Sequence, residues 1–209
     1  MAYPTVSAPY GLQPINRVDG LPYAGAIRQI PIASTYNTAI FNGDIVRVAA
    51  GGTIEKSTVT VDSTTAAANN TVGVFVGVQY VNSQGQTVQG QYYPGNAAAT
   101  SAVAFVVDDP MAAFKVAVTF SGNATVTTVN QSIVGTNIAV RQGTGSTTTG
   151  DSGVSVYATN AQGNAAALPL RVIAVVPDTA ATATTFREVV VKFNNHQYDV
   201  AAEANDYTA

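Results

Sequence analysis

Apolar residues recur at every second position in several short stretches of this chain, which is the period of a β-strand. The clearest stretch is TVGVFVGVQY (residues 71–80), where alternation predicts that the four valines share one face and that Gly73 and Gly77 lie on the other. Shortly before it, NGDIVRV (residues 42–48) places turn residues directly ahead of a second apolar run. These two strands and the polar interval between them are expected to form the β unit that anchors the fold. The two glycines are expected to admit another backbone closely or to mark bulges.

The rest of the chain repeats the same kind of material, and no segment has the 3.6-residue period of a helix. About ten short strands separated by turn residues predict an all-β protein, an antiparallel β-sandwich or a β-barrel. Pro31 marks the first further strand as an edge strand or marks the end of that strand, because proline cannot donate to a ladder. The further expected strands are AIRQIPIA (26–33), VAFVVDDP (103–110), FKVAVTF (114–120, half-buried), ATVTTV (124–129), TNIAVR (136–141), GVSVYAT (153–159), LPLRVIAVV (168–176) and FREVVVKF (186–193).

Three intervals between the expected strands are polar or rich in small residues. Residues 82–96 (NSQGQTVQGQYYPGN) predict a hairpin or a projecting loop, and the range 82–100 is the expected position of any subdomain break. Residues 141–151 (RQGTGSTTTGD) predict a mobile loop that is too small and too polar to pack. Residues 57–70 fit either a loop or one short helix.

The domain organisation predicted from these patterns is an extended arm, a body and a tail. Residues 1–26 form the Pro-rich N-terminal arm, because each proline there fixes φ and favours extended backbone. Such an arm either lies over its own domain or docks on a neighbouring molecule, and the sequence leaves both readings open. Residues 27–200 form the β-rich body, and residues 201–209 form a C-terminal tail.

Charge is scarce in this chain. Charged residues make up 10% of it, its formal net charge is -3, and it has no cysteine and a single histidine. Disulfides and thiolate metal sites are therefore excluded, and the basic footprint of a nucleic-acid-binding protein is missing. No stretch is apolar for the ~20 residues of a membrane helix, and no secretory signal is recognisable. Because net charge normally keeps soluble chains apart, such low charge favours a chain that ends in an assembly.

The residues that resemble catalytic or ligand-binding motifs do not combine into one. Ser152 lies in GDSG, the letters around the nucleophile of trypsin-like proteases, but the chain's one histidine, His196, follows it instead of preceding it. Asp108 and Asp109 carry carboxylates that suit a hard cation, yet a strand ended by an Asp-Asp-Pro turn explains them without a metal. His196 is expected to cap or to line an interface. We therefore expect a protein that is not an enzyme and uses no cofactor and no metal.

Taken in order, these segments resemble a known family. NGDIVRV followed by VGVFVGVQYV is similar to the core of capsid decoration, or cement, proteins of tailed bacteriophages. Further similar segments follow in the same order, namely DDPMAAFKV, IVGTNIAV, TGDSGVSV, LPLRVIAVVP and EVVVKFNNHQY. The resemblance covers roughly residues 27–198, and the arm lies outside it.

The resemblance implies a β-rich protein on the outer surface of an icosahedral head, assembled in the host cytoplasm and bridging major capsid subunits. The implied partners are the major capsid protein and copies of the chain itself, as a dimer or trimer, without nucleic acid or membrane. The apolar and aromatic residues of the arm are the candidate capsid contacts, namely Tyr3, Pro4, Tyr10, Leu12, Ile15 and Tyr23.

A second kind of virion protein is also compatible with the sequence. A head-fibre or tail-fibre component would bind host glycans through a β-sandwich, with Tyr92, Tyr93 and the Thr- and Asn-rich loops as its platform.

Overall fold

A computed structural model of the chain describes residues 6–22, 27–58, 71–96, 99–120, 129–157, 168–177 and 186–198. Within these ranges the fold is all-β, as the alternating patterns predict, with mostly antiparallel sheets and no α-helix. Most of the expected strand at 124–129, most of the interval 57–70 and the whole tail at 201–209 lie outside the described residues.

The described elements are short strands and one 3₁₀ turn, η2. Their bounds are β1 Gln13–Arg17, β2 Ile27–Pro31, β3 Ile40–Phe41, β4 Ile45–Val48, β5 Ile54–Lys56, β6 Gly73–Asn82, β7 Thr87–Gly90, β8 Tyr92–Tyr93, β9 Ala99–Val107, β10 Ala112–Thr119, η2 Gln131–Ile133, β11 Asn137–Arg141, β12 Ser155–Tyr157, β13 Leu170–Val175 and β14 Glu188–Phe193.

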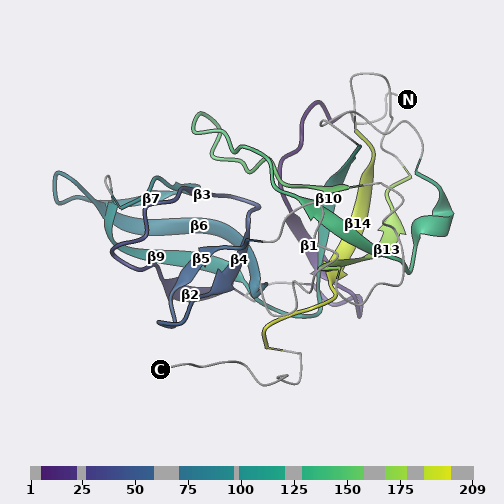
Figure 1. Cartoon of the computed structure of the whole chain (residues 1–209), viewed down its shortest axis with the longest axis horizontal. Coiled ribbons are helices and arrows are strands. Elements are labelled where there is room, and N and C mark those ends of the chain that lie inside the picture. The colour runs from purple at the N-terminus through teal and green to yellow at the C-terminus, as the bar shows by residue number, and fades with distance from the viewer. Residues whose placement is uncertain are drawn as a thin grey trace.

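The strands form two bodies that lie side by side along the long axis of the molecule (Figure 1). The first body is a sheet in the order β2-β9-β6-β4-β5, in which β7 also pairs with β6, and a small β3-β8 sheet accompanies it. In the second body β10-β12-β11-β13-β14 closes on itself through β10–β14 as a five-stranded barrel. Of the two predicted architectures, the barrel is therefore present in the second body.

Strand β10 is more deeply buried than the alternation of FKVAVTF predicts. Ala117 and Thr119 are buried like Phe114 on the core face, and Lys115 keeps partial exposure. Strand β10 pairs with β14 on one edge and with β1 and β12 on the other, so it is an internal strand of its sheet. Phe120 lies beyond the strand end and is 49% exposed.

A β-bulge changes which side chains of β6 face which core. The pairing of β6 with β9 shifts between Phe75 and Gly77, so the strict alternation is lost there. Val74 belongs to the barrel core, whereas Phe75 and Val78 belong to the core of the first body. The prediction that the four valines share one face is therefore wrong, because the bulge shifts the register of the strand.

The two glycines of β6 have the two roles that the sequence left open. A Cβ on Gly73 would overlap the carbonyl oxygen of Val107 on β9, so glycine permits a close approach of two backbones. Gly77 stands at the bulge, and a Cβ there would lie 3.3 Å from the carbonyl oxygen of Gly90.

The chain passes from the first body to the barrel after β9. Residues 82–86 close the hairpin between β6 and β7, as predicted, and β9 pairs with β6 along most of its length. The change of sheet thus occurs at residues 108–111, which lie after the expected break at 82–100. The Asp-Asp-Pro segment ends β9, as the sequence analysis proposed.

The described part of the N-terminal arm packs on the chain itself. Strand β1 pairs with β10, and Leu12 is fully buried in the core that the barrel shares with Ile45 and Val74 of the first body. Residues 12–17 therefore follow the first of the two readings left open above. Contact of the arm with a neighbouring molecule stays a prediction.

Candidate functional site

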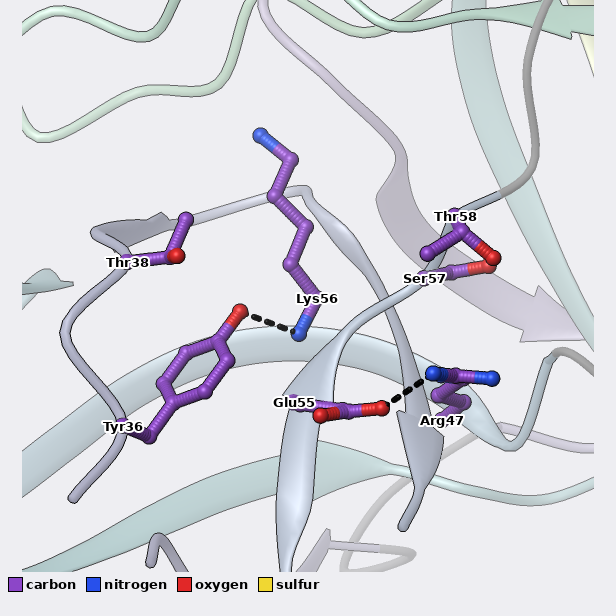
Figure 2. A pocket seen from close by; sticks show the side chains of 7 residues that line it. All are labelled: Tyr36, Thr38, Arg47, Glu55, Lys56, Ser57 and Thr58. Atoms are coloured by element: carbon purple, nitrogen blue, oxygen red, sulfur yellow. Dashed lines mark hydrogen bonds and ion pairs between the residues drawn. The ribbon is translucent and has the colours of Figure 1, made fainter. Parts of the chain in front are cut away.

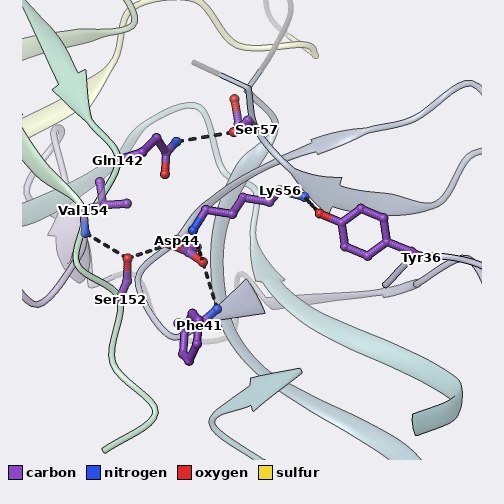
Figure 3. A network of polar contacts seen from close by, with 8 residues as sticks. All are labelled: Tyr36, Phe41, Asp44, Lys56, Ser57, Gln142, Ser152 and Val154. Carbon is purple, nitrogen blue, oxygen red and sulfur yellow. Dashed lines mark hydrogen bonds and ion pairs between the residues drawn. The ribbon is translucent and has the colours of Figure 1, made fainter. Parts of the chain in front are cut away.

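A buried carboxylate lies where the turn at residues 42–44 of the first body meets the loop at residues 142–154 of the barrel, a contact that we call the joint. Asp44 follows the tight turn at Gly43 (φ 90°) and is 0% exposed. Its Oδ2 accepts a hydrogen bond from Phe41 N at 2.9 Å and lies 3.0 Å from Lys56 Nζ. Its Oδ1 accepts a hydrogen bond from Ser152 Oγ at 2.6 Å, across the joint (Figure 3). A charge is tolerated here because it is both paired and hydrogen-bonded.

The hydroxyl of Ser152 both donates and accepts a hydrogen bond at this joint. The hydroxyl donates to Asp44 and accepts a hydrogen bond from Val154 N at 3.0 Å. Main-chain bonds run beside it, from Asn42 N to Gly150 O (3.0 Å) and from Ser152 N to Asn42 O (2.8 Å). The GDSG letters thus build a buried connection between two sheets in this structure.

The glycines of the loop at residues 142–151 pack closely, whereas Thr144 and residues 146–149 are exposed, so the expectation that the loop does not pack is wrong for its glycines alone. A Cβ on Gly145 would overlap the ring of Phe41, and a Cβ on Gly143 would overlap the carbonyl of Gly153. The absence of side chains at these glycines lets the loop lie against β3 and against its own return strand.

The N-terminal segment crosses the same joint. Gly11 N donates to Val154 O at 3.1 Å, and Leu12 N donates to Gly43 O at 3.0 Å. A Cβ on Gly11 would lie 2.7 Å from the Cα of Gly43, so the two backbones touch. The segment therefore binds the first body and the barrel together.

Tyr10 fixes the start of this segment to the barrel. Its hydroxyl donates to the buried carboxylate of Glu188, and Lys115 Nζ lies 3.3 Å from the same oxygen. Lys115 also stands over the Tyr10 ring, 5.8 Å from its centroid. Burial raises the pKa of Tyr10, and the adjacent Glu188 carboxylate adds to the rise because it disfavours the phenolate.

The residues after β14 return to the first body. The side chain of Gln197 accepts from Val48 N at 2.8 Å and donates to Val48 O at 3.3 Å, which imitates one bridge of a β-ladder. Thr71 Oγ1 donates to Asn195 O beside it. His196 is buried against the rings of Phe193 and Tyr198, and its Nδ1 accepts from Tyr198 N at 3.2 Å.

The two aspartates that follow β9 are used in structural ion pairs. Asp108 lies 2.7 Å from Arg28 Nε, and Asp109 lies 3.4 Å from Arg17 Nε and caps the turn by accepting from Met111 N. Burial raises the pKa of Asp108 against the opposing effect of the Arg28 guanidinium. Among the described residues, no group of three or more His, Asp or Glu side chains is placed to hold a metal ion.

A polar pocket opens on the first body beside β5. It has a volume of about 320 Å³ and is lined by Tyr36, Thr38, Arg47, Glu55, Lys56, Ser57 and Thr58 (Figure 2). The Tyr36 hydroxyl accepts a hydrogen bond from Lys56 N at 2.9 Å, and Arg47 forms an ion pair with Glu55. The charged groups of this pocket therefore have partners within the chain.

The predicted capsid contacts differ in their accessibility. Leu12 is a core residue whose side chain is not available at the surface, and Tyr10 is half-buried. Ile15 is 42% exposed and remains accessible. Tyr3, Pro4 and Tyr23 lie outside the described residues.

The arm also exposes two apolar residues that the sequence analysis did not select. Val18 and Leu21 follow β1 in a turn and are 37% and 57% exposed. Arg17 N donates to Leu21 O and Val18 N to Met111 O, both at 2.9 Å, so the turn is tied to the body.

Of the two tyrosines suggested as a platform for glycan binding, one is buried in the core and the other is partly exposed. Tyr93 is 1% exposed and donates its hydroxyl hydrogen to Tyr36 O. Tyr92 is partly exposed and stacks on Phe41, with 5.5 Å between ring centroids.

Sequence reasoning missed the joint because its members lie far apart in the chain. The sequence pattern places Asp44 only in a turn and indicates no role for Lys56, or for Gln142, whose Nε2 donates to Ser57 O at 3.4 Å. One signal was present, since Asp44 is a charged residue directly before an apolar run in a chain with few charges.

Comparison with protein-family models, curated proteins and solved structures found no match for this chain. No helix in the described ranges is long and apolar enough to span a membrane.

Proposed function

We propose that the chain is a non-enzymatic structural protein of a tailed-phage particle. It binds the outer surface of the icosahedral head and holds neighbouring major capsid subunits together. The observation that carries this proposal is that three apolar side chains, Ile15, Val18 and Leu21, are exposed on a segment that is itself fixed to the body. Exposed apolar side chains that gather in one segment are typical of a protein interface.

The anchoring of this segment favours binding. Leu12 and the β1–β10 pairing hold the backbone in place before any partner arrives. An ordered surface loses less conformational entropy on association than a free arm would lose. Ile15, Val18 and Leu21 therefore form a prearranged contact surface for the major capsid protein.

The resemblance in segment order supports the same function. The segments similar to decoration proteins coincide with β4, β6, β10, β11, β12, β13 and β14, so they cover the cores of both bodies. A standard interface buries ~800 Å² per partner, and many copies on one shell combine modest contacts into avidity. Binding the assembled lattice more tightly than free subunits then stabilises the shell by linkage.

The test exchanges exposed side chains and leaves the core intact. Deleting residues 1–26 is not a suitable test, because it would remove Leu12 from the core and β1 from its sheet. A loss of binding could then result from unfolding of the protein. The double variant Ile15→Ser/Leu21→Ser avoids this, and Phe120→Ser is the matched control, because it removes an apolar side chain of similar exposure, 49%, from the barrel end.

Occupancy is measured by cosedimentation with heads purified from the phage that encodes the chain. We expect wild type and Phe120→Ser to saturate the heads and the double variant to bind at least tenfold more weakly. Unchanged binding of the double variant would refute the role of this segment. Failure of the wild-type protein to bind heads would refute the decoration function itself.

The alternative, a glycan-binding fibre component, has less support. Its tyrosine platform retains Tyr92 but not Tyr93, and the polar pocket beside β5 has its Arg47 and Glu55 side chains paired with each other. Saturable binding of the protein to a host-glycan array, lost in Tyr92→Ala, would favour this alternative.

A further inference from the structure

Edge strands expose unpaired main-chain groups, and proteins normally protect them with proline, charge or a bulge. Three edges of this molecule carry such protection. Strand β1 has Pro14 and a register shift at Ile15, and β2 carries Arg28 and Pro31. Strand β5 consists of one isoleucine followed by Glu55 and Lys56.

Strand β7 has none of these protections. It reads Thr-Val-Gln-Gly, without proline or charge, and pairs with β6 in an unbroken register from Val78↔Gly90 to Val81↔Thr87. The sequence contains no charged residue anywhere between Asp62 and Asp108. The whole hairpin that presents this edge is therefore uncharged.

The open groups of β7 follow from the hydrogen bonding of its hairpin. Asn82 N donates to Gln86 O at 2.9 Å, which makes the 82–86 pair a hydrogen-bonded one. Antiparallel pairs alternate, so Tyr80 and Val88 are hydrogen-bonded to each other, whereas the main-chain groups of Thr87 and Gln89 point away from β6. No described residue makes a hydrogen bond with these outward groups, and both side chains are exposed.

We propose that this edge binds the same edge of a second copy of the chain, antiparallel and centred on Val88. Thr87 and Gln89, whose main-chain groups point outward, lie on either side of Val88. A two-fold axis that passes between the two copies of Val88 therefore brings Thr87 of each copy opposite Gln89 of the other. Each such pair exchanges two main-chain hydrogen bonds, and the outward donors and acceptors of β7 are then all used. This inference does not depend on binding to a phage head.

The side chains suit this arrangement. Val88 lies opposite its symmetry mate in a non-hydrogen-bonded pair, where side chains approach most closely and β-branched residues pack well. The hairpin itself brings no charge near its own copy, and such repulsion is the usual obstacle to self-pairing of an edge. A strand of unrelated sequence would satisfy the same main-chain groups, but it would lack this self-complementarity.

A single engineered cysteine tests the register directly, because the natural chain has none. In the proposed dimer the two Cα atoms of residue 88 lie about 4.5 Å apart, within the ~4.4 to 6.8 Å that a disulfide spans. Val88→Cys should therefore form a disulfide-linked dimer under mild oxidation. Gln84→Cys, in the exposed turn of the same hairpin, is the control, since the two copies of residue 84 would lie ~26 Å apart.

A second pair of variants tests the outward main-chain N–H of Gln89 without introducing a thiol. Gln89→Pro removes an outward N–H that β6 does not use, whereas Gln89→Ala keeps it. In sedimentation equilibrium the wild type and Gln89→Ala should approach twice the 21.4 kDa mass of one chain as concentration rises. Gln89→Pro, with an unchanged circular dichroism spectrum, should keep the mass of one chain.

Three outcomes would overturn the proposal. One is a wild-type protein that keeps the mass of one chain up to hundreds of micromolar. Another is cross-linking of Val88→Cys that is no faster than that of Gln84→Cys. The third is a dimer that persists in Gln89→Pro, because its interface would then lie elsewhere.

Discussion

Gly73 and Gly77 occupy similar places in the sequence of β6 but differ in the space around them. A Cβ at Gly73 would overlap a main-chain carbonyl of β9, which cannot move without breaking the ladder. A Cβ at Gly77 would lie 3.3 Å from Gly90 O, a distance that a small shift relieves. The cost of a side chain at each position therefore depends on a contact that the alternating pattern does not reveal.

We expect Gly73→Ala to destabilise the protein by about 3 kcal/mol or more and Gly77→Ala by about 1 kcal/mol, since forced overpacking of a core costs roughly 1 to 3 kcal/mol. The midpoint of urea unfolding measures both. Equal losses at the two positions would contradict the close approach of β6 and β9 at Gly73.

Tyr10 gives the molecule a pH dependence in the alkaline range. Burial and the Glu188 carboxylate raise the pKa of Tyr10 above its ordinary value of 10.0. The unfolded chain loses this proton first, so the stability that the protonated phenol contributes is complete below pH 10.0 and falls as the pH rises above it.

Tyr10→Phe should cost about 1 kcal/mol at neutral pH, where a hydrogen bond is lost, and the difference from wild type should shrink above pH 10. The other buried tyrosines are the same in both proteins and cancel in this comparison. Urea titrations between pH 7 and 11 give the two curves. Parallel curves over that range would contradict the coupling of Tyr10 to Glu188.

At the scale of elements, two loops far apart in the sequence form the joint around Asp44. The turn at residues 42–44 and the loop at 142–154 exchange main-chain hydrogen bonds, and Ser152 joins them through a buried carboxylate. Removing that hydroxyl leaves Asp44 with fewer donors in a site that water does not reach.

Ser152→Ala is therefore expected to destabilise the protein by about 1.5 to 3 kcal/mol, the usual range for a hydrogen bond to a charged group. Ser146→Ala is the control from the same loop, because Ser146 Oγ accepts a bond only at the exposed surface, and it should cost less than about 0.5 kcal/mol. Thermal or urea unfolding compares the two. A loss in Ser152→Ala as small as that of the control would show that the joint contributes little.

The strands with clear alternation were predictable because alternation is local, whereas β1, β3 and β5 are not among the expected strands. The segments around β4, β6, β9, β10 and β14 are each indicated in the sequence by valines at every second position or by turn residues. The bulge in β6 was not predictable, since it depends on how β9 pairs with it. The internal position of β10 likewise depends on its pairing with β1 and β14, which come from opposite ends of the chain.

The candidate site was predictable only in part, for the same reason. Ile15 could be proposed as a contact because the arm carries apolar residues, and it is exposed. Leu12 belongs to the same pattern yet is buried, because β1 joins the barrel. A sequence pattern shows which side chains are apolar, whereas long-range pairing decides which of them remain outside.

At the scale of the whole molecule, three separate segments hold the two bodies together. They are the N-terminal crossing at Gly11 and Leu12, the Asp44–Ser152 joint, and the return of Gln197 to Val48. A molecule connected in this way presents its exposed apolar segment and its open β7 edge in a fixed relation. Such prearranged surfaces suit a protein that spans neighbouring subunits of a lattice.

The most direct measurement of the central proposal is a reconstruction, by electron cryomicroscopy, of the particle of the phage that encodes the chain. We expect density for the two-bodied β molecule on the outside of the head, repeated with the capsid lattice, with residues 15–21 against the major capsid protein. Density restricted to the tail or to fibres, or a head surface without this molecule, would contradict the account.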